Sequence, residues 1–239
     1  GVSSGSAFGA ALSILLFSGT FYTPLFSFTF GVFAVFLTFM VARICNGITT
    51  VMLVLGGSII SSIFSSLLSL VKYLADPSNQ LASITFWNMG SLASIEEKQM
   101  PYAVTAIGIG MIILLLYSWT INVLSISDLE AKTMGLSVER TKVIIILGAT
   151  LCTAGSVSIT GNIGWIGLII PHASRFLIGS DNRKLLPLSM IIGASFLMTV
   201  DLFCRTISGA EIPLGIMTSL IGGPFFIYLL RKFKGGNWR

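Results

Sequence analysis

Charged side chains are scarce in this sequence. Asp, Glu, Lys and Arg make up 10% of its 239 residues, whereas soluble globular domains carry about 25%. A disordered chain is also excluded, because 54% of the residues are hydrophobic. The three cysteines (Cys45, Cys152 and Cys204) lie far apart in apolar surroundings. This spacing is typical of packing residues and not of a disulfide framework or a metal site.

Histidine occurs once, at His172, so the chain cannot form a metal site with several histidines. It also lacks a Gly-x-x-x-x-Gly-Lys-Ser/Thr phosphate loop. If the protein pumps, another chain must hydrolyse the ATP. Gly161, Gly164 and Gly167 loosely resemble a nucleotide fingerprint, but they follow a membrane segment and not a strand. We expect this three-residue spacing to let neighbouring helices approach closely.

Long apolar runs dominate the chain, and each full crossing of a bilayer needs about 20 such residues. They predict an all-α membrane protein, a polytopic bundle of about eight transmembrane helices. The predicted spans are 6–20, 21–44, 48–73, 101–122, 141–158, 162–178, 186–204 and 213–231, of which the first and sixth are short. The apolar stretch 81–92 is shorter still and is interpreted as a re-entrant or interfacial helix.

The net charge of +5 fits the basic excess of cytoplasmic loops. With the C-terminus in the cytoplasm, eleven of the fourteen basic residues fall inside, and the opposite placement would put them outside. The inside set is Arg43, Lys132, Arg140, Lys142, Arg175, Arg183, Lys184, Arg231, Lys232, Lys234 and Arg239. Lys72, Lys98 and Arg205 remain outside. The longest polar segment, 123–142, is then cytoplasmic, while 74–100 and 201–213 are extracytoplasmic.

Several long motifs carry a resemblance to a known family. They are GNIGWIGLIIPHASRF, GSDNRKLLP, GAEIPLG and IGGPFF in the C-terminal half, with KYLADPSNQLASITFWNMGSL and GVSSGSAFGAALSIL upstream. In this order they closely resemble the FecCD-type permeases of bacterial ABC importers, which include the cobalamin permease. Asn162, Trp165 and Asn88 depart from the usual residues. Family members have about ten spans, so we expect a single permease domain over 1–239 that lacks the first two and is N-terminally truncated.

The resemblance implies a transport subunit of the bacterial or archaeal inner membrane, and not an enzyme. Two copies would assemble with two cytoplasmic ATPases and an extracytoplasmic solute-binding protein. This chain would bind no cofactor, and ATP and Mg²⁺ would belong to the ATPase. A ferric siderophore is the first expected cargo, with haem, cobalamin and molybdate as others carried in the family.

The resemblance also assigns the segment 123–142 to coupling helices that rest on the ATPase. Asp128, Glu130, Lys132 and Gly135 are the candidate residues there, and a turn at Gly135 would join two short helices. The alternative is an ordinary solvated loop with scattered charges.

Arg205 matches an arginine that binds an acidic residue of the docked binding protein in the cobalamin permease family. A guanidinium suits a carboxylate partner, but an ion pair with Asp201 one helical turn earlier, or with Glu211, is the alternative. Thr49 and Thr50 match the cytoplasmic gate of the cobalamin permease. The alternative for them is a helix cap.

Several signature residues are expected to be structural: Gly164, Gly167, Pro171, His172, Arg175, Pro213, Gly223 and Pro224. We expect His172 to lie at a helix end, with Pro171 breaking the preceding run. Gly222-Gly223-Pro224 is expected to interrupt the last span and serve helix packing.

Two other function classes compete. A secondary transporter or channel would act alone, but no charged residue lies at mid-membrane depth to relay an ion. An intramembrane enzyme lacks a credible set of acid, base or metal-ligand residues. The leading prediction is therefore an ABC importer permease.

Overall fold

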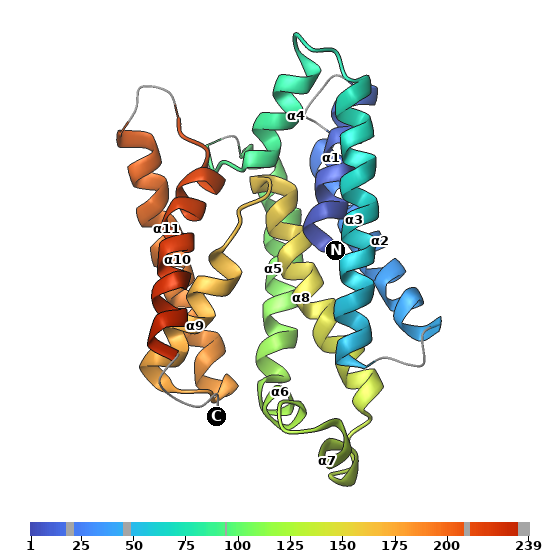
Figure 1. The fold of residues 1–239 in the computed structure, drawn as a ribbon, viewed down its shortest axis with the longest axis vertical. Coiled ribbons are helices and arrows are strands. Elements are labelled where there is room, and N and C mark those ends of the chain that lie inside the picture. The colour runs from blue at the N-terminus through green and yellow to red at the C-terminus, as the bar shows by residue number, and fades with distance from the viewer. Residues whose placement is uncertain (18–21, 45–48, 94, 208–210, 234–239) are drawn as a thin grey trace.

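The computed structural model describes residues 1–17, 22–44, 49–93, 95–207 and 211–233, and these form helices joined by short turns (Figure 1). The longer helices are α1 (Val2–Phe17), α2 (Thr23–Ile44), α3 (Thr50–Leu74), α5 (Met100–Leu116), α8 (Val138–Thr160), α10 (Asn182–Thr206) and α11 (Leu214–Phe233). The shorter ones are α4 (Gln80–Met89), η1 (Glu97–Gln99), α6 (Ser118–Leu124), α7 (Asp128–Thr133) and α9 (Ile166–Ile178). Cys45, Lys234 and Arg239 lie outside the described residues.

The helices match the eight spans predicted from the apolar runs. Five segments are long and apolar enough to cross a membrane: α2, α3, η1 with α5, α8 and α10. The helices α1, α9 and α11 are apolar but shorter over their described side chains, which confirms the expectation for the first and sixth spans. The stretch 81–92 folds as the ten-residue α4, also as expected. The fold class is confirmed.

Two groups of helices lie side by side in Figure 1. The larger group holds α1, α2, α3, α5 and α8, and the smaller holds α9, α10 and α11. Within the larger group, α1 packs closely on α2 because Gly5 and Gly9 present no side chain. A Cβ at Gly5 would lie 2.6 Å from the Phe30 carbonyl oxygen, and one at Gly9 would collide with the Phe26 carbonyl oxygen. This is the small-xxx-small contact of membrane helices.

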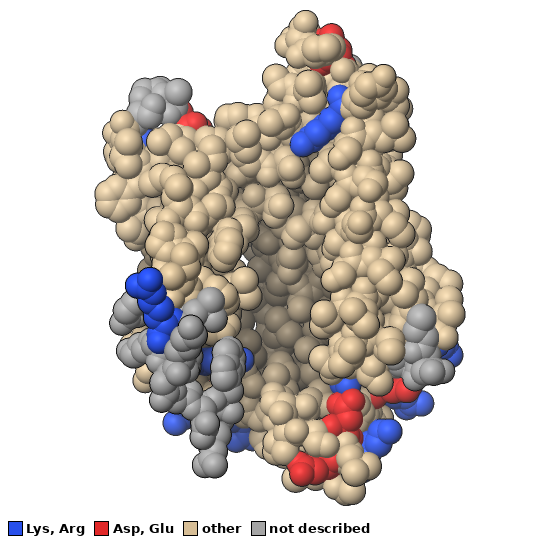
Figure 2. Space-filling view, viewed as in Figure 1, with Lys and Arg blue, Asp and Glu red and all other residues tan. Residues whose placement is uncertain are grey.

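The smaller group is joined to the larger one at one end by three glycines, Gly90, Gly161 and Gly215, which we call the glycine node. Gly90 and Gly161 have φ of 74° and 71°, values that disfavour side chains. The Leu214 N–H donates to the Gly90 carbonyl at 2.9 Å. From Gly161 of this node, a cavity of about 510 Å³ extends between α8 and the residues around Trp165. Figure 2 shows the face hollowed between the two groups.

Four local predictions were wrong. The span 101–122 breaks at Tyr117, so α6 is a separate helix. The predicted span 162–178 begins only at Ile166, because Trp165 takes the left-handed conformation with φ of 68°. Pro171 lies inside α9 and ends no helix. Pro224 likewise lies inside α11, which continues through it. Both prolines lack an N–H, but membrane helices tolerate them because neighbouring helices, Ser and Thr side chains or local adjustments of the helix satisfy the freed backbone groups.

Candidate functional sites

Charge gathers at the two ends of the molecule, and the surface between them is almost free of it (Figure 2). The basic end holds α6, α7 and the C-terminal end of α11. Arg140, Arg183 and Arg231 are exposed there. The other end carries Asp76, Glu211 and Arg205. The uncharged middle is what a bilayer requires, so both candidate partner sites lie outside it.

The segment 123–142 folds as the end of α6, a turn, α7 and the start of α8. The Ser127 hydroxyl caps α7 by accepting from the Leu129 N–H at 3.1 Å. Gly135, with φ of 81°, turns the chain after α7. Val123, Ala131 and Val138 are buried together beneath the turn. The turn at Gly135 is confirmed, but it joins α7 to the long helix α8, so the prediction that it joins two short helices is wrong. A small core makes this segment a defined unit and not an open loop.

Three large apolar side chains project from this unit, and we call them the apolar patch. Ile126 is 66% exposed, Leu129 73% and Met134 62%. Glu130 and Lys132 flank them and are also exposed. An apolar group outside the bilayer and at the surface favours a protein partner.

Asp128 does not face a partner freely, because its carboxylate pairs with Lys142 on α8. The Lys142 Nζ to Asp128 Oδ2 distance is 2.6 Å, with side-chain exposures of 9% and 44%. A lysine this buried needs a charged partner. The pair therefore fastens α7 to the foot of α8, a role that the sequence analysis did not find.

A second polar cluster, also missed from the sequence, joins α6 to the start of α10. The Asn122 Nδ2 donates to Asp181 Oδ1 at 2.7 Å. The Asn122 Oδ1 accepts from the backbone N–H and from the Nδ2 of Asn182, at 2.8 and 2.7 Å. Asp181 also caps α10 through the Arg183 N–H at 3.1 Å. The only signal in the sequence is Asp181 preceding an apolar run, which is typical of an N-cap.

These hydrogen bonds lower the pKa of Asp181 from its ordinary value. The Asn122 amide is the main cause and the Arg183 N–H the next. Because the folded-state pKa is depressed, the ionised carboxylate keeps its partners at neutral pH. The hydrogen bonds weaken only as the pH falls through that lowered pKa.

At the opposite end, Arg205 makes the ion pair with Asp201 that was the alternative interpretation. The Arg205 Nε lies 2.8 Å from Asp201 Oδ2, one turn apart on α10. The arginine side chain remains 46% exposed. Its docking role is not tested by this geometry and stays a prediction.

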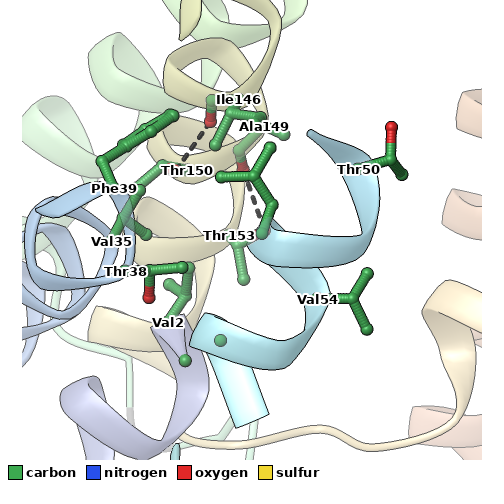
Figure 3. A pocket seen from close by; sticks show the side chains of 13 residues that line it. Val2, Val35, Thr38, Phe39, Thr50, Val54, Ile146, Ala149, Thr150 and Thr153 are labelled. Carbon is green, nitrogen blue, oxygen red and sulfur yellow. Dashed lines mark hydrogen bonds between the residues drawn. The ribbon is translucent and has the colours of Figure 1, made fainter. Parts of the chain in front are cut away.

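Thr49 caps α3, as its alternative interpretation held, by accepting from the Met52 N–H at 3.3 Å. Thr50 lines a cavity of about 350 Å³ between α3, α2 and α8 (Figure 3). Thr38, Thr150 and Thr153 line it too, and Thr150 and Thr153 donate to their own helix. The gate role of Thr49 and Thr50 stays a prediction.

The signature residues form no joint site in the structure. The His172 Nδ1 hydrogen-bonds the Leu168 carbonyl oxygen at 2.8 Å within α9, and not at its end. A Cβ at Gly222 would lie 2.8 Å from Ile169 of α9 and from Trp165, which precedes α9, as expected of a packing glycine. Around Gly164, Gly167 and Gly223 no described atom lies within 4 Å of a built Cβ. Among the described residues, the close approach expected of the three-residue spacing is found at Gly161 but not at Gly164 or Gly167, and in the Gly222-Gly223-Pro224 segment the packing glycine is Gly222. Arg175 is exposed, and Pro213 precedes α11.

Among the residues that the structure describes, no three His, Cys, Asp or Glu side chains come together as a metal site. The geometry defines a polytopic helical membrane protein with its charged side chains gathered at both ends. The chain belongs to the FecCD transport family, a family of transport permease subunits, and the family model matches residues 1–232.

Curated relatives agree with this assignment. The molybdate import system permease protein MolB of Haemophilus influenzae is 41% identical over 239 residues, covering 99% of this chain and 70% of the relative. The cobalamin import system permease protein BtuC of Halobacterium salinarum is 35% identical, covering 97% and 62%. A solved structure of an inward-facing metal-chelate type ABC transporter matches with a TM-score of 0.90 and 39% identity, covering 97% of this chain and 74% of that one.

Proposed function

We propose that this chain is the permease subunit of an ATP-binding-cassette importer and moves a metal complex into the cytoplasm. The observation that carries the proposal is the apolar patch of Ile126, Leu129 and Met134 on a small, capped unit outside the bilayer. Such a unit suits a soluble ATPase that binds ATP and Mg²⁺ and pushes on it. The likeness to a metal-chelate type ABC transporter supports the same assembly.

We place the α7 end and the C-terminus in the cytoplasm of the inner membrane. Support comes from the basic residues gathered at that end. In the proposed assembly, two copies of the chain associate with two ATPases. A solute-binding protein docks at the opposite end, where Arg205 is half exposed.

The face of α3 offers a path for the cargo. Its exposed serines are Ser58, Ser62, Ser65, Ser66 and Ser69. Ser66 and Ser69 donate to the carbonyls of Ser62 and Ser65 at 3.0 Å each, so their hydroxyls are satisfied within the helix. The oxygens of these hydroxyls can still accept hydrogen bonds from water or cargo, but such single bonds are weak. Weak binding is what release requires.

A ferric siderophore remains the first proposed cargo, and molybdate is the strongest competitor. Helicobacter pylori permeases described as probable iron chelatin transport proteins are 34% identical to this chain. The molybdate permease of Haemophilus influenzae is 41% identical. Haem and cobalamin complete the set to be tried.

An ATP-independent transporter or channel is the second candidate. It would need a charged or ion-coordinating group at mid-depth. In the described parts of the spanning helices, charges such as Lys72, Lys142 and Asp201 lie within two turns of a helix end. This distribution favours the importer.

The test is ATP hydrolysis by the reconstituted complex, using the ATPase and binding protein encoded nearest to this chain. We expect loaded binding protein to stimulate hydrolysis, and Leu129→Glu in the apolar patch to abolish the stimulation. Ser180→Glu is the matched control, because it adds the same charge at the same end away from the patch. Normal stimulation in Leu129→Glu would reject the coupling role.

A further inference from the structure

The α9–α11 group has few routes by which it can receive a push applied at α7. At the far end it meets the larger group at the glycine node. Between the ends lies the cavity of about 510 Å³ beside α8. At the near end both α5 and α6 contact α10, and the side-chain hydrogen bonds there are those of Asn122 with Asp181 and Asn182. We call these three residues the Asn122 latch.

The latch connects α6 to the start of α10 through three short hydrogen bonds, of which the one to Asp181 is exposed. The Asn122 amide uses its nitrogen and its oxygen at once, in bonds of 2.7 to 2.8 Å to two consecutive residues. One of those bonds ends on a carboxylate, and bonds to charged groups are the stronger kind. Because Asp181 also caps α10, any displacement of Asn122 acts on the first turn of that helix.

The other end of the connection is α7. Only three residues separate α6 from α7, and Val123 of α6 is buried with Ala131 of α7. A partner that seats on the apolar patch therefore moves Asn122 with it. The path from the patch through α6 to α10 consists of packed or hydrogen-bonded neighbours throughout, which is the physical requirement for mechanical coupling.

We propose that Asn122 is a positioning residue that transmits the motion of the α6–α7 unit to α10 through the Asn122 latch, with the glycine node as the pivot at the other end. This inference rests on the proposed function, since it needs an ATPase that pushes on α7. According to this proposal, the α9–α11 group moves when the α6–α7 unit is pushed.

The test separates hydrolysis from transport in the reconstituted complex with its ATPase and binding protein. We expect Asn122→Ala to keep stimulated ATP hydrolysis and to lower the amount of cargo taken up per ATP by about three- to tenfold. Asn79→Ala is the control, because Asn79 is an exposed asparagine at the opposite end whose side chain makes no cap. It should leave the ratio unchanged.

A swapped pair tells coupling from simple folding. Asn122→Asp alone sets a second carboxylate against Asp181 and should lower the ratio as well. Adding Asp181→Asn restores a donor–acceptor pair with its direction reversed, because an amide at position 181 donates to a carboxylate at position 122, and asparagine also caps helices well. We expect the double variant to recover most of the uptake per ATP, a non-additive result that identifies a direct pair.

Hydrogen exchange gives a readout that does not need transport. In the wild type, ATP binding should change amide exchange in both 128–136 and 182–188, whereas in Asn122→Ala the change should stop at the first segment. An unchanged uptake ratio, a proportional fall in hydrolysis and uptake, or no recovery in the swapped pair would overturn the latch. Absence of stimulated hydrolysis in the wild type would instead overturn the proposed function and the latch with it.

Discussion

Gly161 shows at the scale of one residue how the two helix groups come together. Its φ of 71° is open to glycine and costly for other residues. A Cβ there would collide with the Trp87 carbonyl oxygen, and the backbone of Gly90 is also within 3.0 Å. Because the contacting atoms belong to the backbone, no change of side-chain rotamer can remove such a contact.

We predict that Gly161→Ala destabilises the protein by about 2 to 4 kcal/mol, from backbone strain and overpacking together. Thermal unfolding in detergent would measure it. Gly167→Ala is the matched control, since it lies in α9 with no described atom within 4 Å of the added Cβ. Its effect should stay within about 0.5 kcal/mol. Equal losses in the two variants would show that the close approach is unimportant.

Arg205 forms an ion pair with Asp201, and its side chain is also 46% exposed to the surroundings. We predict that Arg205→Gln weakens docking of the binding protein about three- to tenfold and reduces its salt dependence, because rim charges act mainly on association. Binding at several ionic strengths would measure both effects. Asp201→Asn removes the same ion pair but leaves the arginine free, so it should dock at least as well as the wild type. Equal weakening by both variants would reduce Arg205 to a helix-stabilising role.

At the scale of elements, α7 is a short helix that depends on its attachments. Its six residues are too few for a helix to be stable alone. The capping serine, the buried Ala131 and the Asp128–Lys142 ion pair replace the missing length. Removing one partner of the ion pair is costly, because it leaves the nearly buried Lys142 ammonium without its carboxylate.

We predict that Asp128→Asn destabilises the α7 unit by about 1 to 3 kcal/mol, since it leaves a nearly buried ammonium without its carboxylate. Amide exchange in 128–136 should quicken while the spanning helices keep their protection. Glu130→Gln is the control, because Glu130 is exposed and makes no ion pair within the described residues. Unaltered exchange in Asp128→Asn would mean that the turn holds α7 without the ion pair.

The elements themselves were largely predictable, because apolar run length fixes where a chain can cross a bilayer. The predicted helix boundaries were wrong where the local backbone conformation determines where a helix begins or breaks. Tyr117 breaks a run that is apolar on both sides, and Trp165 delays α9 by adopting a positive φ. Pro171 and Pro224 stayed inside helices since their neighbours tolerate the lost N–H.

At the scale of the whole molecule, the sequence located the ends where partners would dock but not the contacts that hold those ends. Charge counting and the family motifs pointed to Asp128, Gly135 and Arg205. The pairing of Lys142 with Asp128, and of Asn122 with Asp181, depends on residues 14 and 59 positions apart. No periodicity marks such pairs, because tertiary folding alone brings them together.

In the proposed assembly, ATP hydrolysis in a partner subunit drives motion of the helices of this chain. Uptake into proteoliposomes tests this most directly. The vesicles would hold this chain with its ATPase, and the outside solution would hold the binding protein with labelled ferric siderophore, molybdate, haem or cobalamin. The account predicts uptake of one of these cargoes only when the ATPase can hydrolyse ATP. Equal uptake with a hydrolysis-deficient ATPase, or with none, would contradict it.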